Sequence, residues 1–280
     1  MVSNRQTGKK QYQKKKSYTH KRSTFPKWAK YLIQLLLAVI YVWGFYYLFV
    51  SSFNFRWKAI YGSRNYPEVS EIHGIDISHH QGEIKWKKLA GAKINNNPVT
   101  FIIIKATQGV GFVDENFKDN FHNAREYGFI RGAYHYWSNI TSPEQQAEFY
   151  IDKVKLEKGD LAPVLDVEDF PKNADIVTFQ ENVLRWLNIV EEEYGVTPII
   201  YTGYKFKVDY LNSPIFNRYP FWMAHYYVSK VKYKGEWKFW QHTDAGRLPG
   251  INGYVDFDVY NGSYYDLMRL TIGNENDDDR

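Results

Sequence analysis

The chain has 280 residues, of which 44% are hydrophobic and 24% charged, so it has enough apolar surface for a folded domain and is not generally disordered. It has no cysteine, which excludes disulfides, thiolate metal sites and a cysteine nucleophile. Residues 1–58 carry 12 of the 36 basic residues and no acid, whereas the rest carries 24 basic and 31 acidic residues, a pattern unlike that of a uniformly basic nucleic-acid-binding protein.

The first predicted element is a membrane-spanning helix over residues 31–50, in which Gln34 is the only strongly polar side chain. Twenty residues at about 1.5 Å each span roughly 30 Å, the thickness of the hydrocarbon core. Residues 1–30 carry ten Lys and Arg and no acid, which by the positive-inside rule places this tail in the cytoplasm and the rest of the chain outside. A cleaved signal peptide is the alternative, although its apolar core would be shorter. The tail is expected to contact anionic lipid rather than nucleic acid.

After a linker expected at residues 51–70, short apolar runs alternate with helical patterns over residues 71–268, and residues 269–280 form an acidic tail. Continuous apolar runs are typical of strands in a parallel sheet buried on both faces. The predicted fold class is α/β: a TIM-like (β/α) barrel with degraded later helices, with a doubly wound sheet as the alternative. The eight strand-like runs are 72–78, 101–106, 131–137, 163–168, 198–203, 221–226, 237–242 and 254–260.

Three helices are predicted in the first half of this region. One covers residues 114–127 and is ended by Gly128. The next begins at Ser142, where Pro follows and Gln145 completes a capping box. The third covers residues 175–194, and the later connections have few helix signals.

Acidic residues occur at the strand ends, where a barrel builds its active site. Asp166 and Glu168 end the fourth run and, being two residues apart in a strand, point the same way. Carboxyls that close raise each other's pKa, which is what a general acid at neutral pH needs. A D-x-E pattern is usually a solvated strand, but here it ends a run that would otherwise be buried, where unpaired carboxylates are costly. Asp76 is near the end of the first run, and Asp256 and Asp258 lie in the eighth.

Other polar and aromatic residues accompany these acids. Lys105, on the second run, is interpreted either as an ion-pair partner of the acids or as a substrate contact. Tyr134, Tyr201, Trp222 and Trp240 lie at or near strand ends, where a flat ring suits either a sugar or the core.

No metal or cofactor is expected. The histidines at positions 73, 79 and 80 lack the helical spacing of a zinc site and have no obvious third ligand. The sequence has no Walker loop, no dinucleotide-binding glycine motif and no G-x-S-x-G elbow.

The order of these motifs resembles that of glycoside hydrolase family 25, lysozymes that act as N-acetylmuramidases on peptidoglycan. The resemblance covers about residues 72–265 and implies a flattened, irregular β/α barrel without a cofactor. The matching pieces are GIDISHHQGEIKW, FIIIKATQG, RGAYHYW, PVLDVED, PIIYTG, FWMAHY, FWQHT and GYVDFDVY.

The resemblance also implies roles for individual residues. Glu168 corresponds to the general acid/base, and Asp166 to the carboxylate that orients the substrate's own 2-acetamido group, which attacks the anomeric carbon with net retention. Asp76 and Asp256 match the family's other active-site aspartates. The expected substrate-binding residues are Tyr134, Tyr201, Trp222 and Lys105.

Three positions depart from the family pattern: Gln108 stands where Glu is common, and His80 and His242 replace aromatics, all at the expected groove rim. The four acids are all present. We therefore expect a membrane-anchored muramidase that cleaves the β-1,4 bond from N-acetylmuramic acid to N-acetylglucosamine during wall remodelling or turnover, with peptidoglycan and membrane lipid as its partners. A catalytically weak module that tethers the membrane to the wall is the alternative. A chitinase-like enzyme shares the D-x-E pattern but not the other motifs.

Overall fold

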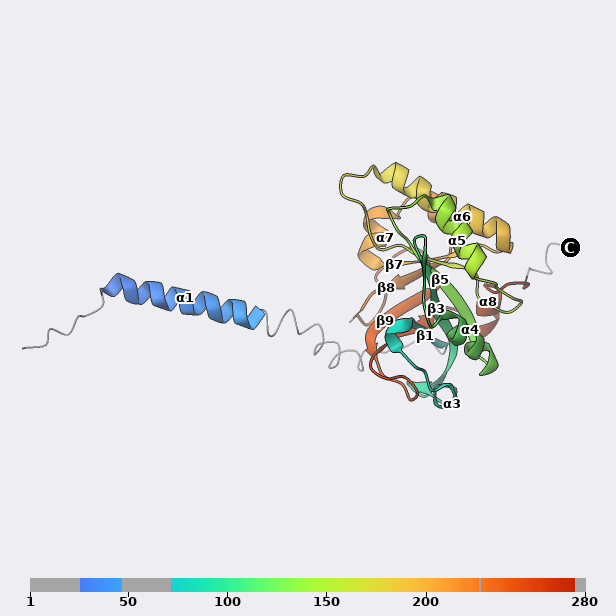
Figure 1. Cartoon of the computed structure of the whole chain (residues 1–280), viewed down its shortest axis with the longest axis horizontal. Coiled ribbons are helices and arrows are strands. Elements are labelled where there is room, and N and C mark those ends of the chain that lie inside the picture. Colours follow the sequence, from blue (N-terminus) through green and yellow to red (C-terminus); the bar gives the residue numbers. More distant parts are fainter. Residues whose placement is uncertain (1–25, 47–71, 227, 275–280) are drawn as a thin grey trace, which may run out of the picture. The chain divides into compact units, whose positions relative to one another are not determined.

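The computed structural model consists of two units, each described by itself. In the first, α1 (Lys27–Phe45) has a mean hydropathy of 1.5 and no buried residue. By length and composition this helix can cross a membrane, either as an anchor or as a signal sequence. It begins four residues before the expected span, and residues 47–50 of that span, the linker and the end of the acidic tail lie outside the described residues. The described residues are 26–46, 72–226 and 228–274 (Figure 1).

The second unit is a barrel. Its strands are β1 (His73–Ile77), β3 (Asn97–Gln108), β5 (Ile130–Tyr136), β6 (Val164–Asp166), β7 (Ile199–Gly203), β8 (Phe221–Ala224), β9 (Phe239–Gly246) and β10 (Val255–Tyr260). They follow one another in the order β1-β10-β9-β8-β7-β6-β5-β3, and β1 pairs with β3, which closes the ring. The ring confirms the predicted barrel and excludes the doubly wound alternative. Two short strands, β2 (Lys93–Ile94) and β4 (Phe112–Val113), pair with β3 outside the ring.

The barrel departs from a fully parallel one at a single strand. β10 runs antiparallel to both β9 and β1, whereas the other neighbouring strands of the ring are parallel. The connection from β9 to β10 is short and contains no helix in the described structure, and a short connection can only join antiparallel neighbours.

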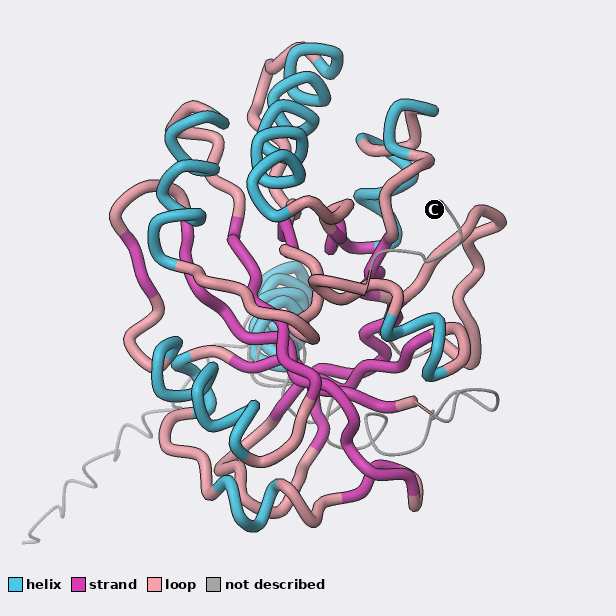
Figure 2. The backbone as a smooth tube through the Cα atoms, turned by 90° about the vertical axis from the view of Figure 1, so that its right-hand side faces the viewer, coloured by secondary structure: helices cyan, strands magenta, loops and turns pink. Residues whose placement is uncertain are grey.

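The helices of this unit lie around the strands (Figure 2). The three predicted helices are present as α4 (Phe117–Glu126), α5 (Pro143–Lys153) and α6 (Ile176–Tyr194), and the later ones are short, as predicted. Ser142 accepts a hydrogen bond from the Gln145 N–H at 3.2 Å and caps α5, while Asp175 caps α6 and Gly195 ends it in the left-handed conformation. The helices are α3 (Trp86–Leu89), α4 (Phe117–Glu126), α5 (Pro143–Lys153), α6 (Ile176–Tyr194), α7 (Tyr204–Tyr210) and α8 (Tyr264–Met268), with single 3₁₀ turns η2 (His79–Gln81) and η3 (Pro214–Phe216).

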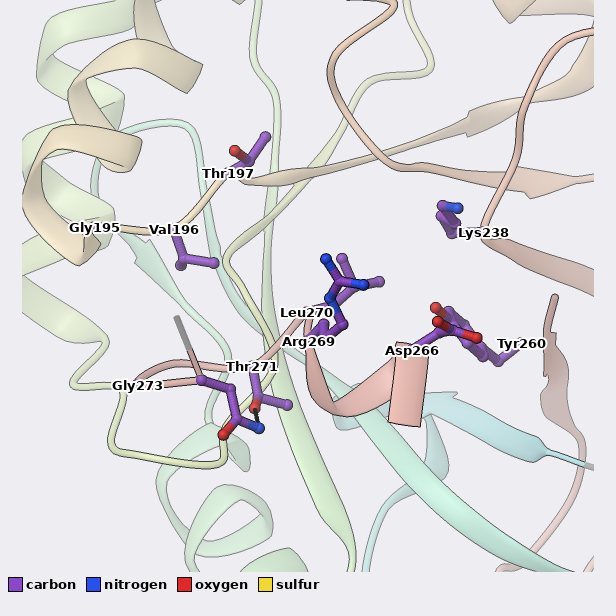
Figure 3. Close-up of a pocket in the computed structure, with 11 residues that line it drawn as sticks. Gly195, Val196, Thr197, Lys238, Tyr260, Asp266, Arg269, Leu270, Thr271 and Gly273 are labelled. Carbon is purple, nitrogen blue, oxygen red and sulfur yellow. Dashed lines mark hydrogen bonds between the residues drawn. The ribbon is translucent and has the colours of Figure 1, made fainter. Parts of the chain in front are cut away.

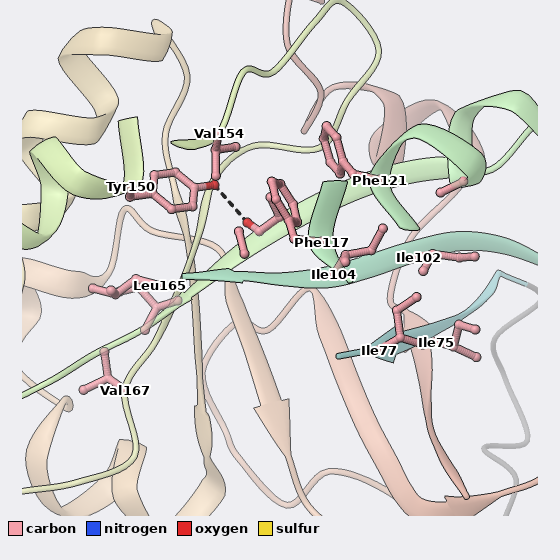
Figure 4. Close-up of a cluster of buried hydrophobic side chains, with 14 of the residues drawn as sticks. Ile75, Ile77, Ile102, Ile104, Phe117, Phe121, Tyr150, Val154, Leu165 and Val167 are labelled. Atoms are coloured by element: carbon pink, nitrogen blue, oxygen red, sulfur yellow. Dashed lines mark hydrogen bonds between the residues drawn. The ribbon is translucent and has the colours of Figure 1, made fainter. Parts of the chain in front are cut away.

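Alternating side chains of the strands form two apolar layers. Ile102 and Ile104 of β3 point outward and pack with Phe117 and Phe121 of α4 (Figure 4). Phe101 points inward, where its ring lies edge-on to the buried ring of Phe239. Gly74 of β1 makes room for it, because a Cβ there would lie 2.3 Å from the Phe101 ring.

The same alternation places polar groups above the inner apolar layer. Along β3, Phe101 and Ile103 are followed on the inner face by Lys105, and along β6 Val164 is followed by Asp166. Both strands therefore have apolar residues in the lower barrel and polar residues at their C-terminal ends. This end of the barrel holds the candidate site.

Candidate active site

A cavity of about 240 Å³ at the C-terminal strand ends contains all eight predicted site residues. The structure thus brings together residues that are up to 180 positions apart in the sequence. The eight residues are Asp76, Lys105, Tyr134, Asp166, Glu168, Tyr201, Trp222 and Asp256. The cavity is also lined by residues that the sequence did not assign to it as contacts: Ser78, Tyr136, Tyr226 and Gln241.

The two carboxyls of the D-x-E pattern reach the cavity because the backbone stays bonded to the neighbouring strand for one residue beyond β6, which ends at Asp166. The Val167 N–H donates to the Tyr201 carbonyl of the neighbouring strand at 2.9 Å, and the Val167 side chain is buried on the outer side. Asp166 and Glu168 therefore face inward together. Asp166 is only 7% exposed, whereas Glu168 is open to the cleft.

Both carboxyls favour the protonated form more than an ordinary acid does. Burial raises the pKa of Asp166 well above its usual value, the charge of Glu168 raises it further, and Lys105 opposes the rise. The pKa of Glu168 is also raised, mainly by desolvation and then by the charge of Asp169, while the nearby Tyr201 hydroxyl and the charge of Lys105 oppose the rise. A raised pKa in a group open to the cleft is the property of a general acid.

The Asp166 carboxylate has no hydrogen-bond donor among the described residues. Its Oδ1 is buried and without a partner. Because a buried carboxylate without a donor is costly, such a group in the wall of a cavity is suited to accept an N–H or O–H from a bound molecule.

A second carboxyl pair lies deeper in the barrel. Asp258 is fully buried and accepts from the Trp222 indole N–H at 2.8 Å, while Asp76 accepts from the Gln241 side-chain amide at 2.5 Å. The Asp258 Oδ2 is buried and has no hydrogen-bond partner among the described residues. Both carboxyls therefore favour the protonated form. Burial raises the pKa of both groups well above the ordinary value, and a neighbouring carboxylate raises each further, Asp258 for Asp76 and Asp256 for Asp258.

Gln241 links this pair to the groove. It is 2% exposed, and its Oε1 accepts hydrogen bonds from the Tyr201 hydroxyl at 2.7 Å and from the Tyr226 hydroxyl. The sequence could have identified Gln241 as a cavity residue by its position. It stands two residues after Phe239 in a buried strand, so the two side chains lie on the same inner face. Gln241 therefore holds two tyrosines and one aspartate in a single network.

Lys105 is half-buried and makes no ion pair with a described carboxylate. Its Nζ donates to Gln108 Oε1 at 2.9 Å and lies 5.0 Å from the Tyr136 ring centre and 5.5 Å from that of Phe112. Burial lowers the pKa of this amine, and the charge of Asp166 is the largest influence that raises it.

Similarity to known proteins identifies the family of this barrel. The model for Glycosyl hydrolases family 25 matches residues 75–251, more than half of the chain. The chain belongs to this family. It is therefore a glycoside hydrolase of the lysozyme, or muramidase, class.

Relatives and solved structures agree with this assignment. The chain is 41% identical to Uncharacterized protein YegX of Escherichia coli over 208 residues, which cover 74% of this chain and 76% of that protein. It is 32% identical to Lysozyme M1 of Streptomyces globisporus over 217 residues, 72% of each protein. The structure of a bacterial lysozyme from Streptomyces coelicolor matches with a TM-score of 0.65 and 30% identity, covering 73% of this chain and 98% of the other. A family 25 glycosyl hydrolase from Bacillus anthracis matches with a TM-score of 0.67 and 27% identity, covering 74% and 96%.

The three departures from the family 25 pattern have different surroundings. His80 lines the cavity, and Gln108 is the hydrogen-bond partner of Lys105. The expectation that His242 lies at the groove rim is wrong, because its side chain is 2% exposed and lies against the rings of Trp240 and Phe257. Strand alternation is the reason: the neighbouring residue on β9 faces the cavity, so His242 faces away.

His135 lies outside the cavity, and no metal site is found among the described residues. His135 is buried on the outer side of β5, where Nδ1 lies 2.7 Å from Thr107 Oγ1 and Nε2 3.2 Å from Gln146 Oε1, and burial lowers its pKa to about 4. Within the described ranges, no group of three or more His, Cys, Asp or Glu side chains is placed to hold a metal.

A larger cavity of about 440 Å³ lies at the opposite end of the barrel (Figure 3). Its lining includes Lys238, just before β9, and Arg269, and Asp266 is the only acidic residue among the described residues that line it. Asp266 already accepts from the Ser263 N–H at 2.9 Å in the cap of α8. The described lining thus offers a single carboxyl, not the pair that acid/base cleavage of a glycoside uses.

Proposed function

We propose that the barrel hydrolyses the β-1,4 bond between N-acetylmuramic acid and N-acetylglucosamine in peptidoglycan, with retention of configuration. The names of its relatives support the substrate class: Lysozyme M1, the Autolytic lysozyme of Clostridium acetobutylicum and the N,O-diacetylmuramidase of Chalaropsis sp. The observation that carries the mechanism is the buried, partnerless Asp166 carboxylate beside Glu168, a carboxyl with a raised pKa that is open to the cleft.

In the first step, Glu168 donates its proton to the oxygen of the glycosidic bond as that bond breaks. Asp166 accepts the N–H of the 2-acetamido group, which turns the carbonyl oxygen of this group toward the anomeric carbon. That oxygen forms the new bond to carbon and closes a five-membered ring. In the second step, water attacks the anomeric carbon, the Glu168 carboxylate takes its proton, and the ring reopens. Two inversions at one carbon produce net retention.

The surrounding acids favour the positive charge that develops on the sugar ring. Asp256 lines the cavity, and so does Asp76, beside the buried Asp258. Hydrogen bonds from Gln241 to Asp76 and from Trp222 to Asp258 hold these carboxyls in place, so they need no reorganisation during the reaction.

The expected membrane topology of the chain supports a role at the cell's own wall. With α1 as an uncleaved anchor, the basic residues of 1–30 stay on the cytoplasmic side beside anionic lipid, and the barrel lies outside. An anchored hydrolase acts only within reach of its membrane, which fits remodelling or turnover. A purely tethering module has no need of the D-x-E pair, and both acids face the cavity.

The stereochemical outcome tests the mechanism. Proton NMR of the first product from peptidoglycan glycan strands is expected to show the β anomer at the new reducing end before mutarotation. Initial appearance of the α anomer would mean direct attack by water and would overturn the role of the acetamido group. Glu181→Gln, on the outer face of α6, is the matched control for Glu168→Gln and is expected to keep full activity.

A further inference from the structure

Lys105 is the only lysine or arginine that lines the cavity, in the part of the chain that the structure describes. Four carboxyls line the same cavity, so an ion pair would be the ordinary arrangement for its ammonium group. Instead, the neutral amide of Gln108 and the faces of Tyr136 and Phe112 hold it. The Lys105 ammonium is thus held in position and half-buried, and no described carboxylate forms an ion pair with it.

The position of Lys105 relative to Asp166 follows from strand register. Tyr136 of β5 is the register partner of Asp166 on β6 and also of Gln108 on β3. The three residues therefore form one row across adjacent strands, with Asp166 at one end and the Lys105–Gln108 contact at the other. The Lys105 ammonium lies over the ring of the middle residue.

Two substituents of the muramic acid ring follow one another in the same order as Asp166 and the Lys105–Gln108 contact. Its 2-acetamido group and its 3-O-lactyl group are carried by neighbouring carbons of the sugar ring. A sugar that places its acetamido N–H on Asp166 has its lactyl group one substituent further along, within the same cleft. The lactyl group ends in a carboxyl, the partner that a positioned ammonium favours.

We propose that Lys105 is a specificity-determining residue that binds the lactyl carboxylate of the muramoyl unit whose acetamido group Asp166 holds. This inference rests on the proposed function and adds to it a preference for glycan in which the lactyl carboxyl is free. Such glycan is produced by the class of reaction that hydrolyses the amide between muramic acid and its stem peptide. In peptide-bearing glycan the same group is an amide and has no charge.

The test compares three substrates with the full-length protein in a non-ionic detergent. The first is peptide-free glycan with free lactyl carboxylates, the second is the same glycan with each lactyl carboxyl converted to its methyl amide, and the third is peptide-bearing glycan. The variants are Lys105→Met and Gln108→Glu, the latter supplying an internal carboxylate that competes for the ammonium. Lys153→Met is the matched control, because Lys153 also lies over a ring, that of Phe149 at 5.7 Å, but on the surface of α5.

For Lys105→Met, kcat/KM on the free-carboxylate glycan is expected to fall about 10-fold to 100-fold, mainly through KM, with much less change on the methyl amide. Gln108→Glu is expected to change kcat/KM in the same direction by a smaller factor. Equal loss on both peptide-free substrates would overturn the proposal, since Lys105 would then act on the acids of the site rather than on the lactyl group. A loss confined to peptide-bearing glycan would also overturn it, by assigning the carboxylate to the stem peptide. Failure of the unsubstituted protein on all three substrates would instead refute the proposed function.

Discussion

Replacing Asp258 by Asn tests whether Asp76 and Asp258 share a proton. The asparagine side chain keeps an oxygen for the Trp222 indole and places an amide donor where a proton shared with Asp76 would lie. If the two carboxyls share a proton, the variant replaces that proton-dependent contact by an amide hydrogen bond that needs none. We expect the substitution to stabilise the barrel at neutral pH.

The magnitude follows from linkage between protonation and folding. Because the pKa of Asp258 is raised in the folded state, the folded barrel keeps a proton that the unfolded chain releases above an ordinary value of 3.8. The free energy of unfolding therefore falls as the pH rises above about 4, by about 1.4 kcal/mol per pH unit until the folded-state pKa is reached. At pH 7 this cost is at most about 4 kcal/mol. If a third to a half of it is recovered, Tm rises by about 2–8 °C.

Calorimetry of the full-length protein between pH 4 and pH 8 measures this effect. The gain in Tm of Asp258→Asn is expected to be largest at pH 7–8 and to vanish near pH 4. Asp119→Asn, an exposed position on α4, is the control and is expected to show no such trend. A gain independent of pH, or a variant that is less stable at pH 7, would refute the shared proton.

Three further predictions follow from the same contacts. Asp166→Asn is expected to lower kcat by about 10²-fold to 10³-fold, measured on purified glycan, because the acetamido group loses its charged acceptor; an unchanged kcat would contradict its role. The rate is expected to fall as the pH rises through the raised pKa of Glu168, since the acid must be protonated, and a rate that still increases above neutral pH would exclude this acid. Arg131→Met is expected to destabilise the barrel by about 2–3 kcal/mol in denaturant unfolding, because it removes two guanidinium contacts to buried Asp160, at 2.8 and 3.0 Å, and leaves the one from Arg125 at 2.7 Å; a loss below about 1 kcal/mol would contradict this.

The parts of the site that could be predicted are those determined by strand periodicity. The polar residues that end apolar runs, such as Lys105 and Asp166, face the cavity because every second residue of a strand does. The same rule, applied one residue further, would have placed His242 outward and Gln241 inward. That error came from following the motif rather than the alternation.

The remaining features depend on contacts between distant segments. Gln241 and Asp76 are 165 positions apart, so their hydrogen bond has no local sequence pattern. The reversal of β10 was not predicted because an apolar run reads the same in either direction. The helix α7 was missed because it is only seven residues long and rich in aromatic residues, and packing stabilises it: the ring of Tyr210 stacks on that of Phe170 at 4.4 Å.

The central claim is cleavage by Glu168 on the muramic acid side of the bond. Mass spectrometry of the products from purified peptidoglycan, with the full-length protein and with Glu168→Gln, tests it most directly. We predict soluble fragments with N-acetylmuramic acid at the reducing end, and none from the variant. Fragments ending in N-acetylglucosamine, or equal release by the variant, would contradict the account, and intact glycan that still binds the protein would indicate a tethering module instead.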